Sequence, residues 1–73
     1  MASKRYNFRW VAVSPDIRGC AMGYIEVEAF DDVSAKVIAE ATVKQNGSID
    51  WMLEISDNVD VVATLEEGET HVG

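Results

Sequence analysis

The most informative side chains of this sequence are carboxylates that stand at alternating positions. Glu26 and Glu28 alternate with Ile25, Val27 and Ala29, which is the pattern of a half-buried strand. Two residues along a strand span about 6.6 Å and neighbouring strands lie about 4.8 Å apart, so carboxylates at these spacings gather on one face. The full set is Glu26, Glu28, Asp50, Glu54 and Asp60. We expect an acidic patch that mimics DNA and occupies a nucleic-acid-binding cleft on another protein.

Apolar and aromatic side chains interleave with these carboxylates. They are Tyr24, Phe30, Met52 and Val62. Aromatic residues and Met are frequent anchors of protein interfaces. The predicted partner-binding surface comprises Tyr24, Glu26, Glu28, Phe30, Asp50, Met52, Glu54 and Asp60. Two alternatives stay open: a solvated outer face, which is common in antiparallel sheets, and a face covered by edge pairing or a homodimer.

Catalysis has little support in the sequence. His71 and Cys20 are each the only residue of their kind, so no zinc-binding spacing exists and no second thiol or imidazole can complete a site. Gly19 and Gly23 are not followed by the Gly-Lys-Ser/Thr of a phosphate-binding loop, and the next element reads as a strand. We predict a protein that is not an enzyme and that holds no metal or cofactor.

The length and composition predict one small cytoplasmic domain spanning residues 1–73. The chain has 73 residues, of which 48% are apolar, and this is the composition of a folded protein. No apolar run approaches the roughly 18 residues that a membrane span needs, and no apolar segment follows the basic start as in a secretory signal. The single cysteine, Cys20, cannot form an internal disulfide, which favours the reducing cytoplasm of a bacterial host.

The net charge of −7 is distributed unevenly along the chain. The first 20 residues carry four basic side chains and only one acidic side chain, whereas the remainder carries two basic and twelve acidic ones. Direct nucleic-acid binding depends on neutralising phosphates, so this balance opposes it. It suits a basic partner protein, although it also suits a protein that is merely soluble.

The elements that would position these residues follow from periodicity. Strands are expected at about 6–14, 23–30, 49–56 and 59–65. One helix should begin at Asp31-Asp32, whose carboxylates can cap it, and end at Asn46-Gly47. The order ββαββ predicts an α+β two-layer sandwich, in which one helix covers one face of a four-stranded antiparallel sheet. Trp51, Leu53 and Ile55 would then face the helix, and residues 1–5 and 66–73 would be flexible.

The run from Ile25 to Ala39, IEVEAFDDVSAKVIA, resembles a strand-to-helix join found in small bacteriophage proteins. It is similar to a small anti-CRISPR protein of the type I inhibitors, in which the same join precedes a strand hairpin. The resemblance covers about fifteen residues, and the element order extends it across most of the chain. It implies a stoichiometric inhibitor that binds a CRISPR surveillance complex, through one of its Cas proteins, and obstructs DNA recognition.

A second run, Ser14 to Cys20 with the sequence SPDIRGC, is similar to a turn of HicB-type antitoxins. That resemblance implies a protein that neutralises a small toxin. In that family the helix follows the turn shortly, whereas here a full strand intervenes, and no DNA-binding segment is present. An antitoxin or another non-enzymatic protein-binding module is therefore the alternative to the inhibitor.

Overall fold

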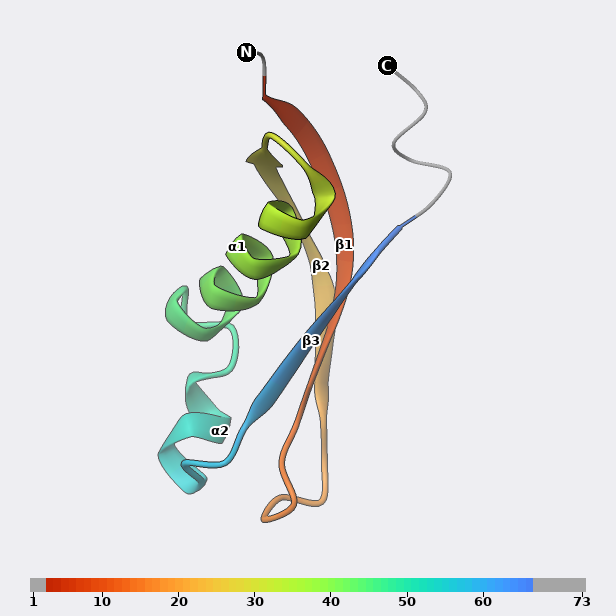
Figure 1. Ribbon diagram of the computed structural model, residues 1–73. Coiled ribbons are helices and arrows are strands. Elements are labelled where there is room, and N and C mark those ends of the chain that lie inside the picture. Colours follow the sequence, from red (N-terminus) through yellow and green to blue (C-terminus); the bar gives the residue numbers. More distant parts are fainter. Residues whose placement is uncertain (1–2, 67–73) are drawn as a thin grey trace.

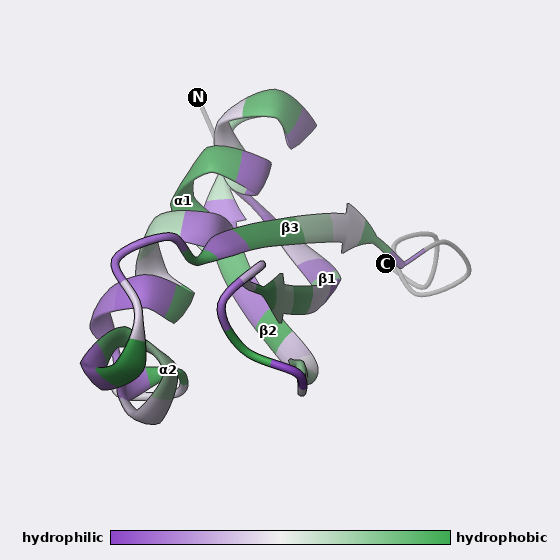
Figure 2. Cartoon of the chain, turned by 90° about the horizontal axis from the view of Figure 1, so that it is seen from below, coloured by the Kyte–Doolittle hydropathy of each residue, from purple (hydrophilic) through white to green (hydrophobic). Residues whose placement is uncertain are grey.

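The computed structural model describes residues 3–66 as three strands and two helices. In chain order they are β1 (Lys4–Val13), β2 (Ala21–Ala29), α1 (Asp32–Gln45), α2 (Asp50–Ile55) and β3 (Asp60–Leu65). Both helices lie on one side of the strands (Figure 1), and the view from below shows the same layering (Figure 2). Within residues 3–66 the fold is a two-layer α+β arrangement with three strands, not the four that the sequence predicted.

The strand β1 lies at the centre of the sheet, which has the order β2-β1-β3 and antiparallel pairing throughout. Phe8, Trp10 and Ala12 point towards the helices and are buried, whereas Val11 and Val13 point to the opposite face. A strand with apolar side chains on both faces is typical of the interior of a sheet and not of its edge. β1 begins at Lys4, so Lys4 and Arg5, which were expected in the flexible segment 1–5, belong to the sheet.

The helix α1 begins and ends where its capping residues require. The Asp31 carboxylate accepts a hydrogen bond from the Ser34 backbone N–H at 2.7 Å and so satisfies one of the orphan donors of the first turn. At the other end, the Asn46 N–H donates to the Thr42 carbonyl, and Gly47 follows with φ of 93°, a conformation that favours glycine. The predicted limits of this helix are confirmed.

The strand predicted at 49–56 is wrong, because these residues form the helix α2. Ile49, Met52 and Ser56 are buried, and their spacing is that of a helix. Trp51 and Ile55, which a strand would have turned inwards, are exposed. The segment carries apolar residues both at the two-residue period of a strand and at the helical period of about 3.6 residues, so alternation alone could not decide between them. The four-stranded ββαββ sandwich is therefore replaced by the order ββααβ.

The core lies between the sheet and the helices. It consists of Phe8, Trp10, Ala12, Val27, Ala29, Ala35, Ala39, Val43, Ile49, Met52, Val59, Val61 and Ala63. Small alanines on α1 let the helix approach the sheet closely. Met52 from α2 has a flexible side chain that can fill an irregular gap in the core. Trp51, Leu53 and Ile55 are not among these residues, which corrects their predicted inward orientation.

A buried hydrogen-bond network joins the β1–β2 loop to the connection between α2 and β3. The Ser14 hydroxyl donates to the Ser56 hydroxyl oxygen at 3.2 Å, and the Ser56 hydroxyl donates to the Asp16 carboxylate at 2.6 Å. The Asn58 backbone N–H also donates to the Ser56 oxygen at 2.9 Å. Because each polar group has a partner, the network fixes the two loops against each other without an unsatisfied buried group.

Candidate protein-binding surface

The open face of the sheet is formed by the side chains that point away from the helices. Because strand residues alternate, the members follow from the buried positions of each strand. They are Arg5, Asn7, Arg9, Val11 and Val13 from β1, Met22, Tyr24, Glu26 and Glu28 from β2, and Asp60, Val62 and Thr64 from β3. Glu66, next to the end of β3, donates its backbone N–H to the Asn7 carbonyl at 2.8 Å and so continues the pairing.

Charges of both signs lie on this face. Arg5 on the central strand pairs with Glu28 at 3.6 Å, and Arg9 pairs with Glu66 at 3.7 Å. These side chains are largely exposed, apart from Glu66, so the pairs contribute little to stability. Their effect on the surface is larger, because two arginines divide the carboxylates into separate groups. The continuous acidic patch expected from the sequence is therefore interrupted by basic residues.

Next to the charged part lies a group of apolar side chains, which we call the apolar band: Val11, Val13, Met22, Tyr24 and Val62. Val11 pairs in register with Met22 on one side and with Val62 on the other, so three apolar residues cross the sheet in a row. Met22 is 66% exposed, Tyr24 73% and Val62 52%. Contiguous exposed apolar residues with a polar border are typical of protein interaction sites.

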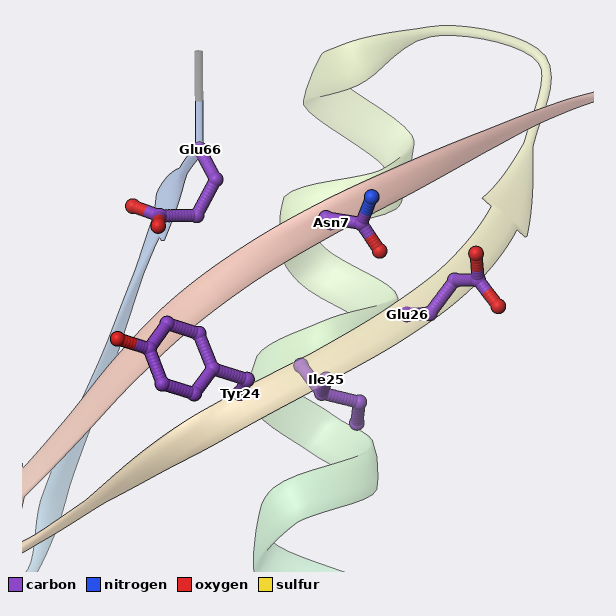
Figure 3. Close-up of a pocket in the computed structure, with 5 residues that line it drawn as sticks. All are labelled: Asn7, Tyr24, Ile25, Glu26 and Glu66. Carbon is purple, nitrogen blue, oxygen red and sulfur yellow. The ribbon is translucent and has the colours of Figure 1, made fainter. Parts of the chain in front are cut away.

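A shallow hollow of about 320 Å³ lies beside the apolar band. Asn7, Tyr24, Ile25, Glu26 and Glu66 line it, and Figure 3 shows the Tyr24 ring leaning from β2 across β1 towards Glu66. The hollow contains the Tyr24 ring and two carboxylates, Glu26 and Glu66, which lie on opposite sides of Asn7. An aromatic face and carboxylates attract a cation, so the basic side chain of a partner suits this position.

The structure places half of the predicted partner-binding residues on the open face. Tyr24, Glu26, Glu28 and Asp60 belong to it. Phe30 follows β2 in the connection to α1 and is exposed. The remaining three, Asp50, Met52 and Glu54, lie on α2 in the helical layer, and Met52 is fully buried. Their assignment to the sheet face was wrong because it depended on a strand that does not exist.

Sequence reasoning missed the residues that β1 contributes to this face. Residues 1–5, which include Arg5, and residues 66–73, which include Glu66, were expected to be flexible, and Arg9 was counted only among the four basic side chains of the first 20 residues. The register of β1 with its neighbours brings these three side chains next to the carboxylates. The alternation of Arg5, Asn7, Arg9 and Val11 with the buried Phe8 was the signal that could have found them.

Two carboxylates outside the open face have lowered pKa values. At Asp31, the hydrogen bond from the Ser34 backbone N–H is the main cause of the lowered pKa. At Glu40, partial burial acts to raise the pKa, but the Lys36 ammonium, the Ala63 backbone N–H and the charge of Lys44 together outweigh it. Both groups serve the structure, one as a helix cap and the other at the edge of the sheet.

The described part of the chain offers neither a metal-binding cluster nor a membrane-spanning helix. Within residues 3–66, no three His, Cys, Asp or Glu side chains cluster closely enough to hold a metal ion. His71 lies in segment 67–73, outside the described residues. Neither α1 nor α2 has the length and apolar content needed to cross a bilayer.

Comparison with known proteins adds no assignment. Searches against protein-family models, curated proteins and solved structures each returned no match.

Proposed function

We propose that this protein is a non-enzymatic binding module that attaches to a protein partner through the open face of its sheet. The observation that carries the proposal is the apolar band, which crosses all three strands and of which Val13, Met22, Tyr24 and Val62 are exposed. Burying exposed apolar area is the main driving force of protein association, and Tyr24 and Met22 are residues of the kind that anchor interfaces.

The charges on the same face indicate what kind of partner fits. Two arginines and four carboxylates give the open face a net negative charge, and Glu26 forms no ion pair with a residue in 3–66. A partner with a matching apolar surface and basic residues around it would meet this pattern. The carboxylates would then determine orientation and association rate, while the apolar band would supply most of the affinity.

Within this class, we favour a phage-type inhibitor that acts in the bacterial cytoplasm on a nucleic-acid-binding protein of a CRISPR complex. The support is the resemblance of segment 25–39 and the need for a basic partner. Mimicry of DNA by carboxylates alone is not retained, because Arg5 and Arg9 lie among them. The inhibitor would instead obstruct the complex by covering part of its basic surface. A toxin-neutralising module is the second candidate, supported by the resemblance of segment 14–20.

The experiment compares two double variants with the wild type. Val13→Lys/Val62→Lys places charge in the apolar band, whereas Val33→Lys/Val37→Lys places the same charge on exposed positions of α1. Phage plaquing is measured on bacteria that carry an active type I CRISPR system and express each protein. We expect the wild type and the α1 variant to restore plaquing and the band variant to lose this effect.

The same three proteins, immobilised on beads, test the binding surface independently of the CRISPR assignment. A host protein retained by the wild type and the α1 variant but lost by the band variant supports the open face as the site. Retention of a small basic toxin in this pattern, without any effect on plaquing, favours the toxin-neutralising module. Equal retention by all three proteins contradicts the proposal.

A further inference from the structure

The two edges of the sheet are protected differently. At the outer edge of β3, the Ala63 backbone N–H donates to the Glu40 carboxylate of α1 at 3.0 Å, and Glu40 also pairs with Lys36. A charged side chain thus occupies the position at which another strand would bind. Covering an edge in this way is a common defence against unwanted strand pairing.

The outer edge of β2 has no such cover. The Glu66 N–H donates to the Asn7 carbonyl, so the backbone N–H and C=O groups of Asn7 point towards β3. Because these groups alternate in direction along a strand, those of Phe8 and Trp10 point towards β2. In β2 their partners Ile25 and Gly23 therefore bond to β1. The residues between and beside these partners direct their backbone N–H and C=O groups outwards: Met22, Tyr24, Glu26 and Glu28. Within residues 3–66, no side chain or loop forms a hydrogen bond with these outward groups.

The strand itself is suited to pairing. Its register with β1 runs without interruption from Ala21 to Ala29, so no bulge bends the edge away. Its sequence, AMGYIEVEA, contains neither proline nor lysine, the residues that usually discourage an edge partner. Tyr24 and Met22 are exposed beside the free backbone groups, and Ile25 is only partly buried beneath them.

We infer that β2 pairs antiparallel with β2 of a second copy of this chain, which joins two three-stranded sheets into one of six strands. A two-fold axis at Tyr24 gives a self-complementary register over residues 21–27. Each Tyr24 lies opposite its counterpart, and each Glu26 lies opposite Met22 of the second copy. Shifting the axis to Glu26 would oppose two carboxylates, which is unfavourable.

The inner face of β2 fits the same register. Gly23 has no side chain, and the Trp10 indole packs directly over its backbone. The ring is so close that a Cβ at Gly23 would come within 2.9 Å of it. In the paired strands, Ile25 of the second copy lies opposite Gly23 and meets the Trp10 indole at this position. The half-buried Ile25 is thereby covered, and the small residue accommodates the larger one.

The overall charge sets how the dimer responds to salt. Each copy carries a net charge of −7, so two copies repel each other. Salt screens this repulsion, and the Debye length falls from about 30 Å at 0.01 M to about 10 Å at 0.1 M ionic strength. The dimer should therefore be stronger at the higher salt concentration, the reverse of an association held by ion pairs.

Analytical ultracentrifugation of the full chain tests this pairing. Tyr24→Pro removes an outward N–H but no bond to β1, so the monomer fold is preserved and both central bonds of the dimer are lost. We expect the wild type to dimerise and the variant to associate about 10- to 100-fold more weakly. A wild type that stays monomeric at both salt concentrations overturns the inference, as does a dimer that Tyr24→Pro does not weaken.

A cross-linking experiment keeps the test decisive if the proline variant fails to fold. In a Cys20→Ser background, Tyr24→Cys places one thiol at the two-fold axis, where paired strands bring the Cα atoms within disulfide range. Val62→Cys is the matched control, since it is exposed on the same face but lies on β3. Rapid oxidation to a dimer for Tyr24→Cys alone supports the pairing, and equal rates for both contradict it. Both tests measure self-association of the purified chain, without host protein or phage, so the partner-binding proposal is judged separately.

Discussion

At the scale of single residues, Gly23 is a position at which one added methyl group should disturb the packing of the core. An added Cβ would lie 2.9 to 3.1 Å from three atoms of the Trp10 indole, and Trp10 is buried. We expect Gly23→Ala to lower the free energy of unfolding by about 1–3 kcal/mol, because the ring must shift within a packed core. Urea unfolding followed by tryptophan fluorescence measures the change.

Gly19 provides the control for this substitution. A Cβ at Gly19 would have no neighbour within 4 Å, so Gly19→Ala should change the free energy of unfolding by no more than about 0.5 kcal/mol. Equal effects of the two substitutions would show that the close packing of Trp10 on the β2 backbone does not exist in solution.

The two carboxylates with lowered pKa values predict how stability depends on pH. Asp31 and Glu40 have ordinary values of 3.8 and 4.5, and both are lowered in the folded protein. As the pH falls, the unfolded chain therefore takes up protons before the folded protein does, so the stability from these two groups is fully present above about pH 5 and is lost as the pH falls below their ordinary pKa values. Urea unfolding across this range should give a shallower pH dependence for Asp31→Asn/Glu40→Gln than for the wild type. An unchanged slope would assign the acid sensitivity to other groups.

At the scale of elements, the pattern of buried side chains in α2 distinguishes a helix from a strand. As a strand, segment 49–56 would bury Ile55 and expose Met52, whereas the helix buries Met52 and leaves Ile55 62% exposed. We expect Met52→Ala to lower the free energy of unfolding by about 2–5 kcal/mol, because it opens a cavity in the core. Ile55→Ala should cost about 0.5 kcal/mol. The opposite order of the two effects, measured by urea unfolding, would favour the strand.

The extent to which sequence predicts these elements depends on how local their signals are. The limits of α1 could be predicted because Asp31 and Gly47 act on their immediate neighbours. Segment 49–56 could not, since its apolar residues satisfy two periods and only contact with the rest of the core selects one. The candidate site shows the same difference between local signals and contacts that form only in the folded protein. Tyr24 and Glu26 were identifiable from alternation within β2, but their position beside Arg9 is set by pairing between strands.

At the scale of the whole molecule, dimer formation should appear as a concentration-dependent thermal stability. A small domain has a limited core, so an interface that exists only in the folded state adds a noticeable share of stability. We expect the Tm of the wild type to rise as protein concentration is increased from about 1 µM to about 1 mM, and the Tm of Tyr24→Pro to rise less over the same range. Differential scanning calorimetry at matched concentrations and salt measures both. A wild-type Tm that does not change with concentration would contradict the dimer.

The two proposals use different parts of the same sheet. Strand pairing occupies the edge of β2, whereas partner binding uses the open face, so one copy can do both at once. In the dimer, two apolar bands lie on one continuous sheet. If a partner presents two matching surfaces, the second contact becomes intramolecular, and the overall affinity rises without any new type of contact.

The hydrogen bond between Glu40 and the Ala63 N–H has a consequence for handling the protein in acid. Once Glu40 is protonated it loses its ion pair with Lys36 and binds the β3 edge more weakly. That edge then becomes a template on which further chains can add, as in the growth of amyloid fibrils. Samples stored in strong acid should therefore develop fibres that stain with thioflavin T, and Glu40→Gln should form them even in neutral buffer.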